Sequence, residues 1–290
     1  MSIFHDLLNA FPEQHCITKN GVVAYREAGA KNGGLPIVLL HGIGSGASSW
    51  VCQLDVLGGD RRVLAWDAPG YGATTPVDAA EPSADDYAQK LAAWLDAMGI
   101  ARCVLVGHSL GAIMASAFAG RFSQRVQALL LLSPAIGYGK DVPLIRFEKR
   151  DRRLRMLAEL GVQGMAEKRS ANLLSAQAGE VEQAWVRWNM ARIPAAGYVQ
   201  ATHLLANADI SENINIAPYT GPLSIAVGGA DMITPPEKCA GLVEQLQQPE
   251  RAVAFHIFDG IGHACYIEDA KAVTTYIQNF VAFFSAPSAT

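Results

Sequence analysis

The chain has 290 residues, half of them hydrophobic, enough to bury the core of one large domain or two small ones. Its 23 basic and 27 acidic side chains give a net charge of −4, so we expect no nucleic acid as main partner, because phosphate binding requires a basic surface. Five cysteines without a CxxC pair indicate neither a disulfide framework nor a zinc site. We therefore expect no metal.

The N-terminal stretch MSIFHDLLNAFPEQ has no basic start, long apolar run or small-residue cleavage site, so it is not typical of a signal peptide. No apolar stretch is long enough to span a bilayer, and no membrane partner is expected. Together with the unpaired cysteines, these features predict a cytoplasmic protein. Monomer and homo-oligomer both remain open.

The predicted elements alternate between short apolar strands and helices. Around the turn signal Asn20-Gly21, residues 15–28 predict two short strands. Near-continuous apolar runs then suit strands covered on both faces. In chain order, the pattern predicts strands at 36–41 and 62–67, a helix at 84–98, a strand at 102–107, a helix at 110–122 and a strand at 126–133.

The alternation then stops, because residues 134–218 have a helical pattern without a convincing strand. It resumes with a strand at 222–228, a helix at 236–247, a strand at 252–258 and a helix at 270–284. The whole pattern predicts an α/β fold with a mostly parallel central sheet flanked by helices. We expect a core domain formed by 1–133 and 219–290, and a helical cap of 134–218 over the strand ends, where such sheets bind ligands.

A candidate nucleophile lies in Gly107-His108-Ser109-Leu110-Gly111, which matches the pattern G-x-S-x-G. The segment follows an apolar strand and opens a helix rich in alanine and glycine. A nucleophilic serine in this context sits on a strained strand-to-helix turn, and side chains at the two glycines would collide with the neighbouring strand and helix. The alternative is a serine that only caps the helix.

Five motifs occur in a characteristic order: HGIG, DAPGYG, GHSLG, GGADMITPP and GIGHACYIED. In this order the chain resembles the α/β-hydrolase family along nearly its full length. The resemblance implies the α/β-hydrolase fold, with a helical cap inserted into the core. It also implies a catalytic Ser-His-Asp triad.

The resemblance assigns the base of the triad to His263, one of seven histidines, in the loop after the last predicted strand. Asp231 follows the 222–228 strand and would orient that histidine, in the chain order Ser…Asp…His expected of this fold. Some relatives carry the acid after the preceding core strand, but here that loop, SPAIGYG, contains no acid before Asp141, which favours Asp231. Asp67 is interpreted as a structural residue of the DAPGYG loop. Alternatively, His263 satisfies local backbone groups and Asp231 is a turn or N-cap residue.

Backbone N–H groups that stabilise a developing oxyanion are expected from two loops. Leu110, directly after the nucleophile, would supply one, and the family position of the second falls on Ile43. Gly42 and Gly44 would let that backbone approach the substrate. The alternative is a flexible glycine turn.

Candidate pocket residues are His41, Gly42, His108, Trp185 and Trp188. Each histidine is interpreted first as a packing or hydrogen-bonding support, with a substrate role as the alternative. The tryptophans lie three apart on a predicted helix, a spacing typical of core packing, although one could roof the pocket. Residues 146–155 carry six basic and two acidic side chains, which predict a solvated helix face or, alternatively, attraction of anionic substrates.

Two cap segments, RRLRMLAELGVQGMAE and GYVQATHLLANADI, resemble the enol-lactonases of aromatic-compound degradation, whose substrate is a carboxylate-bearing lactone. The middle of the cap departs from that pattern, because it reads SANLLSA where those enzymes commonly have an Arg-Trp-Phe-like segment. The resemblance therefore implies a reaction class rather than a particular lactone.

The sequence predicts hydrolysis of a carboxylic ester or lactone of a small molecule through an acyl-enzyme, without a metal or organic cofactor. A carbon–carbon bond hydrolase of ring-cleavage products is a second hypothesis, although such relatives more often have asparagine where this chain has His108. A cofactor-free oxygenase is a third. A ligand-binding receptor on the same fold is a fourth, but no partner-binding tail or extra domain supports it.

Overall fold

A computed structural model describes residues 2–31, 34–216 and 219–285. Its eight strands form one sheet in the order β1-β2-β4-β3-β5-β6-β7-β8. The strands are β1 Gln14–Thr18, β2 Gly21–Ala28, β3 Ile37–Leu40, β4 Val63–Trp66, β5 Cys103–His108, β6 Val126–Leu132, β7 Leu223–Gly228 and β8 Val253–Phe258. Strand β2 pairs antiparallel with β1 and β4, and the other neighbours are parallel. The predicted mostly parallel sheet is confirmed.

Helices cover both faces of the sheet, and side chains of one strand alternate between the two layers. Val38 and Leu40 of β3 pack in a cluster with α3 (Ala84–Ala97) and α4 (Leu110–Arg121), whereas Ile37 and Leu39 pack with α2 (Val51–Leu57) and α11 (Ala270–Ser285). The helices of these layers are α1 Ser2–Ala10, α2 Val51–Leu57, α3 Ala84–Ala97, α4 Leu110–Arg121, α9 Pro236–Leu246, α10 Cys265–Glu268 and α11 Ala270–Ser285, with 3₁₀ helices η1 Ala47–Trp50 and η2 Ser123–Arg125.

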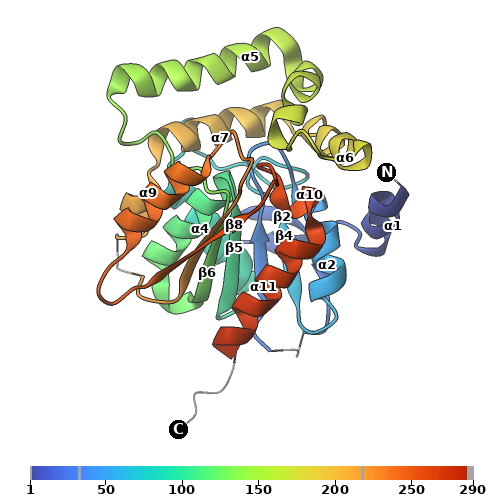
Figure 1. Cartoon of the computed structure of the whole chain (residues 1–290), viewed down its shortest axis with the longest axis vertical. Coiled ribbons are helices and arrows are strands. Elements are labelled where there is room, and N and C mark those ends of the chain that lie inside the picture. Colours follow the sequence, from blue (N-terminus) through green and yellow to red (C-terminus); the bar gives the residue numbers. More distant parts are fainter. Residues whose placement is uncertain (1, 32–33, 217–218, 286–290) are drawn as a thin grey trace.

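The segment between β6 and β7 is helical, as expected, and its described residues contain no strand. Figure 1 shows α5, α6 and α7 together above one end of the sheet. The elements are α5 Pro143–Arg169, the 3₁₀ helix η3 Ser170–Leu173, α6 Glu180–Met190, α7 Ala195–Asn207 and α8 Ile210–Asn213. The expected domain division also includes residues 1, 32–33, 217–218 and 286–290, which lie outside the described residues.

Helix α5 contains a sharp bend at Gly161, whose backbone (φ 62°, ψ 179°) is not helical. Only glycine readily adopts this conformation. The bend divides α5 into two limbs, and both limbs reach the site described below.

No helix among the described residues is long and apolar enough to cross a membrane.

The strand order determines where a ligand site can form. From β3 the chain winds to β4 on one side, and then returns to β5 on the other side of β3. The carboxyl ends of β3 and β5 therefore flank a topological switch point, where parallel α/β sheets bind ligands. The loops after these two strands contain Ile43 and Ser109.

Candidate active site

Ser109 lies on the tight turn between β5 and α4. Its backbone (φ 52°, ψ −113°) is strained, and among the described non-glycine residues only Ser133 also has a positive φ. A Cβ on Gly107 would lie 2.4 Å from the carbonyl oxygen of Gly111, and one on Gly111 would lie 2.2 Å from that of Leu40 in β3. The predicted need for both glycines is confirmed.

Three backbone hydrogen bonds hold this turn. The Ser109 N–H donates to Leu132 in the neighbouring strand (2.9 Å), and its carbonyl accepts from Ala112 (3.0 Å) and Ala135 (3.2 Å). The Ser109 side chain makes no capping hydrogen bond to α4, which removes the capping alternative. The backbone is therefore fixed while the hydroxyl remains available.

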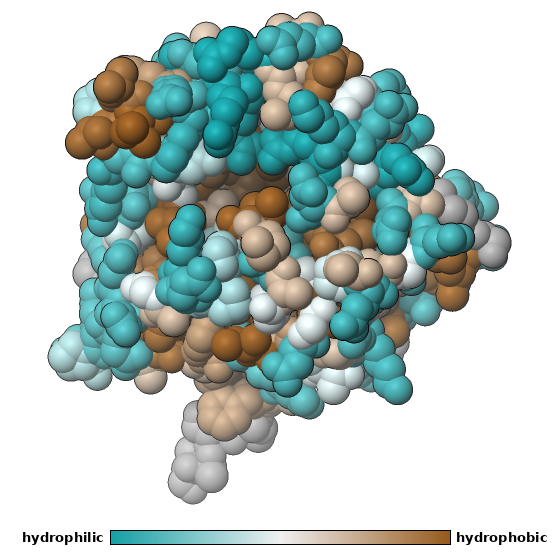
Figure 2. Space-filling model, turned by 45° about the horizontal axis from the view of Figure 1, so that its top comes forward, coloured by the Kyte–Doolittle hydropathy of each residue, from teal (hydrophilic) through white to brown (hydrophobic). Residues whose placement is uncertain are grey.

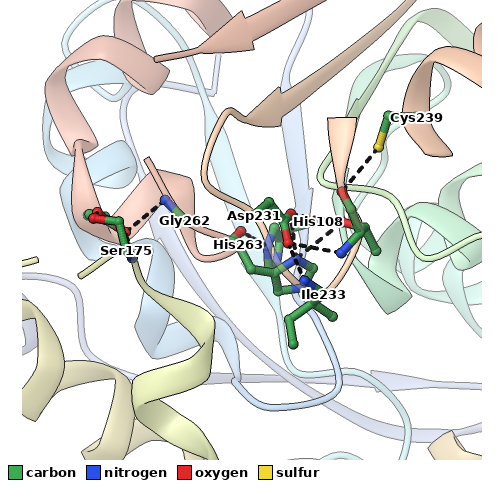
Figure 3. A network of polar contacts seen from close by, with 9 residues as sticks. His108, Ser175, Asp231, Ile233, Cys239, Gly262 and His263 are labelled. Carbon is green, nitrogen blue, oxygen red and sulfur yellow. Dashed lines mark hydrogen bonds and ion pairs between the residues drawn. The ribbon is translucent and has the colours of Figure 1, made fainter. Parts of the chain in front are cut away.

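Asp231 and His263 form a buried pair (Figure 3): the Asp231 Oδ2 lies 2.8 Å from the His263 Nδ1. The same carboxylate accepts hydrogen bonds from the N–H of Ile233 (2.8 Å) and of Thr234 (2.9 Å), and from the Thr234 hydroxyl (2.8 Å). Asp231 thus both holds its own turn, as the alternative interpretation proposed, and contacts His263. Burial opposes ionisation, but the His263 and Thr234 contacts lower the pKa of Asp231 to about 2.

This pairing selects the tautomer of His263. Because an ionised carboxylate only accepts hydrogen bonds, the Nδ1 atom carries the proton and Nε2 keeps a lone pair. Within the described chain the Ser109 hydroxyl makes no hydrogen bond, but Ser109 and His263 line the same cavity. Hydrogen bonds of this kind often shorten only when substrate binds.

Two backbone N–H groups are candidates for an oxyanion site. Leu110 is the first residue of α4, and the first N–H groups of a helix have no acceptor within it. The peptide that carries the Ile43 N–H is held through the Gly42 carbonyl, which accepts from the Ser45 N–H (3.2 Å), and the next carbonyl, that of Ile43, accepts from the Tyr71 hydroxyl (3.0 Å). A Cβ on Gly42 would lie 3.1 Å from the Ser109 Cβ, so this loop packs directly against the predicted nucleophile.

A cavity of about 430 Å³ connects these groups with the helices above the sheet. Figure 2 shows this face hollowed beneath a mainly hydrophilic rim, with hydrophobic side chains inside the hollow. Its lining includes Gly42, Ile43, His108, Ser109, Leu110 and His263, together with apolar side chains such as Met165, Leu173 and Met190. The predicted nucleophile, base and oxyanion loop are therefore brought together, and Asp231 contacts the base from behind.

His41 does not belong to the described lining, which corrects its expected place in the pocket. The N–H of Ala68 donates to His41 Nε2 (3.0 Å), so Nδ1 carries the proton and donates to the Gly42 carbonyl (2.8 Å). Burial lowers the pKa of His41 to about 4. Both ring nitrogens of His41 make hydrogen bonds, and His41 supports the loop that contains Gly42 and Ile43.

His108 does line the cavity, as expected. Its Nε2 donates to the carbonyl of His263 (2.9 Å), while the buried Nδ1 has no partner among the described residues. Burial and then the neighbouring His263 lower the pKa of His108 to about 3, which keeps the ring neutral. His108 thus supports the backbone of the predicted base.

The two tryptophans are also absent from the described lining, and the suggestion that one roofs the pocket is corrected. Trp185 is fully buried and stacks on Phe4 of α1, with ring centroids 4.8 Å apart, and on Trp188 at 4.7 Å. Their spacing of three residues reflects core packing, which was the first interpretation.

A sequence profile described as the alpha/beta hydrolase family matches residues 37–275, most of the chain. The chain belongs to this family. A (lyso)-N-acylphosphatidylethanolamine lipase from Mus musculus is 33% identical over 103 residues, which cover 34% of this chain and 30% of the lipase. An acetyltransferase component of the acetoin cleaving system from Pseudomonas putida is 36% identical over 110 residues, 38% of this chain and 29% of the relative. The chain thus matches about 30% of the length of these curated relatives.

Solved structures of other proteins share the fold over nearly the whole chain. A malate-bound esterase from Thermogutta terrifontis superimposes with a TM-score of 0.81 at 22% identity, covering 95% of this chain and 100% of the esterase. The enol-lactonase from Burkholderia xenovorans LB400 superimposes with a TM-score of 0.78 at 21% identity, covering 93% and 100%.

One carboxylate next to the site was missed from the sequence. Glu268 of α10 accepts hydrogen bonds from the N–H of Gly262 (3.0 Å) and of Ser175 (2.9 Å), and from the Ser175 hydroxyl. It therefore joins the loop of His263 to the segment after η3. The only signal in the sequence was an acidic residue five positions after His263.

Metal-binding residues do not gather near the site. Across the described ranges, no group of three or more histidine, cysteine, aspartate or glutamate side chains could hold a metal ion. All five cysteines are free thiols.

Proposed function

We propose that the protein is a serine hydrolase that cleaves a carboxylic ester or lactone of a small organic molecule through an acyl-enzyme. One observation carries the proposal: Ser109, on a strained turn, shares a cavity with His263, whose Nδ1 is bound at 2.8 Å by the buried Asp231. A serine hydroxyl becomes a good nucleophile only when such a base removes its proton.

In the proposed reaction, His263 Nε2 accepts the proton of the Ser109 hydroxyl while Oγ bonds to the substrate carbonyl carbon. The Ile43 and Leu110 N–H groups stabilise the resulting oxyanion. The carbonyl re-forms as the ester C–O bond breaks, and His263 returns its proton to the leaving alcohol oxygen. His263 Nε2 then takes a proton from a water molecule, whose oxygen bonds to the acyl carbon. As the bond from the acyl carbon to Oγ breaks, His263 gives that proton to Oγ, and the acid leaves.

We further propose that residues 134–218 act as the cap that selects the substrate. Met165, Leu173 and Met190 from this segment line the cavity above Ser109. A volume of about 430 Å³ suits a small organic molecule, since ligand pockets typically measure roughly 300–1,000 Å³. The apolar lining favours an acyl or alcohol group with some hydrocarbon surface.

The test measures hydrolysis of p-nitrophenyl butyrate, a small lactone and a vinylogous diketone by wild type and by Ser109→Ala. An oxygen electrode measures oxygen uptake by the same two proteins. We expect wild type to hydrolyse the ester or the lactone, and Ser109→Ala to lose about 10³-fold or more of kcat. Cleavage of the diketone alone would establish carbon–carbon hydrolysis. Oxygen uptake that persists in Ser109→Ala would establish an oxygenase. Either result would refute the proposal.

A further inference from the structure

The cap side of the cavity carries an excess of positive charge. Its ionisable lining, apart from histidine and tyrosine, is Lys140, Lys149, Arg153, Arg169, Lys238, Asp141 and Asp209. Both carboxylates are already paired, Asp209 with Lys140 (3.3 Å) and Asp141 with Lys149 (2.7 Å). Lys238 lies exposed at the surface. Within the described chain, the two arginines form no ion pair.

Arg153 presents an unused donor. Its Nη2 donates to the hydroxyl of Tyr138 (3.3 Å), whereas its Nη1 is buried without a hydrogen-bond partner in the described structure. The hydroxyl of Tyr198, on the same lining, is buried and lies beside the Arg153 guanidinium, but it makes no well-aligned hydrogen bond in the described structure, and this tyrosine is 3% exposed. Buried polar groups are nearly always hydrogen-bonded, so this adjacent pair of donors, neither with a well-aligned acceptor, indicates an acceptor that binds in the cavity.

Arg169 approaches the same place from the other limb of α5. The bend at Gly161 lets both limbs line one cavity, although sixteen positions separate the arginines. Burial and then the neighbouring charge of Arg153 lower the pKa of Arg169. Two guanidinium groups held close together repel each other, and an anion between them would convert that repulsion into attraction.

We propose that Arg153, Arg169 and the Tyr198 hydroxyl form an anion-binding subsite in the cap. The substrate of the proposed hydrolase then carries a carboxylate or phosphate group besides its scissile carbonyl, and this clause rests on the proposed function. Both groups present several acceptor oxygens to a guanidinium, which binds them through paired, charge-assisted hydrogen bonds. The subsite holds the anion at the cap end while the carbonyl reaches Ser109.

The first test uses a matched pair of esters, mono-p-nitrophenyl glutarate and the neutral p-nitrophenyl hexanoate. The measured quantity is the kcat/KM for the glutarate ester divided by the kcat/KM for the hexanoate ester. We expect Arg153→Met and Arg169→Met each to lower the ratio about 10- to 100-fold, the usual effect of losing a charge-assisted hydrogen bond. Arg153→Lys should restore part of it. Arg155→Met, which changes an exposed arginine on the same helix, is the control and should leave the ratio unchanged.

The second test measures binding without catalysis. We expect glutarate or inorganic phosphate to raise the Tm of Ser109→Ala, and the additional Arg153→Met change to abolish the shift. The ligand that gives the larger Tm shift indicates whether the substrate carries a carboxylate or a phosphate group. Hydrolysis of the neutral ester with an unchanged ratio, or absence of any Tm shift, would overturn the subsite. Hydrolysis of neither ester, with the Tm shift intact, would overturn the proposed function and leave the subsite standing.

Discussion

Asp231 is the residue whose surroundings matter most for the proposed chemistry. Three hydrogen bonds from Ile233 and Thr234 fix its carboxylate, and one oxygen faces the Nδ1 of His263. The carboxylate therefore stays ionised at neutral pH and holds the ring with its lone pair on Nε2. An asparagine at this position has only one oxygen acceptor in its side chain. Because the N–H groups of Ile233 and Thr234 compete for that oxygen, the amide NH₂ group would face Nδ1 of His263.

We therefore expect Asp231→Asn to lower kcat about 10³- to 10⁴-fold, because the imidazole would rest in the wrong tautomer. Steady-state hydrolysis of p-nitrophenyl butyrate measures the effect. Asp259→Asn, an exposed aspartate after β8, is the matched control and should retain wild-type kcat. A similar loss in both variants, or less than a tenfold loss in Asp231→Asn, would contradict the assigned role.

At the scale of elements, the bend in α5 brings two charges to one cavity. Arg152 and Arg155 are exposed, as expected of a solvated helix face, whereas Arg153 lines the cavity. Past Gly161 the second limb contributes Arg169 and the buried Met165. If residues 134–218 select the substrate as proposed, that selectivity depends on the backbone conformation at Gly161 as well as on the side chains.

Gly161→Ala should lower the glutarate-to-hexanoate ratio, because alanine strains this backbone by about 1–3 kcal/mol and favours a straighter helix. Kinetics on both esters measure the ratio, and thermal denaturation measures the strain. Gly241→Ala in α9 is the control, since that glycine is helical and its added Cβ meets nothing within 4 Å. Equal ratios in wild type and Gly161→Ala would show that anion binding does not depend on the bend.

A second link between elements runs through Glu268, which accepts hydrogen bonds from both Ser175 and Gly262. Glu268→Ala should lower the free energy of unfolding by about 1–3 kcal/mol, because it leaves partly buried N–H groups unpaired. Urea denaturation of Glu268→Ala, Ser175→Ala and the double variant gives a double-mutant cycle. We expect a coupling energy of about 0.5–1.5 kcal/mol, and additive effects would show that the contact is not stabilising.

At the scale of the whole molecule, sequence periodicity was sufficient for the sheet but not for the cavity lining. Continuous apolar runs identify strands that are covered on both faces, and the glycines around Ser109 follow from close backbone contacts. The pattern around Trp185 shows an inward helix face, but its partner Phe4 lies in α1, far away in sequence and not predicted as a helix. Likewise, nothing local to His41 indicates that Ala68 occupies its second nitrogen.

The buried neutral histidines make stability depend on pH. The pKa of His41 falls from 6.5 to about 4 on burial, so as pH falls below about 6.5 the unfolded chain binds a proton that the folded chain refuses. Stability is therefore complete above pH 6.5 and decreases towards pH 4, by about 3 kcal/mol from this residue. His108 acts in the same direction, and buried Asp67, whose pKa burial raises to about 6, opposes them.

His41→Gln should flatten this dependence, because glutamine does not titrate but can accept the Ala68 N–H. Urea denaturation of wild type and variant at pH 7.5, 5.5 and 4.5 measures the difference, with the Asp67 and His108 contributions common to both. Parallel curves for the two proteins would mean that His41 is not held neutral in the fold.

The proposed function depends on the Ser109 hydroxyl being the activated nucleophile of the cavity. Intact-mass spectrometry after treatment with a fluorophosphonate probe tests it most directly, since the probe forms a stable bond only with an activated serine. We expect one adduct per chain in the wild type, none in Ser109→Ala, and greatly slowed labelling in Asp231→Asn. Equal labelling of wild type and Ser109→Ala, or an unlabelled wild type, would contradict it.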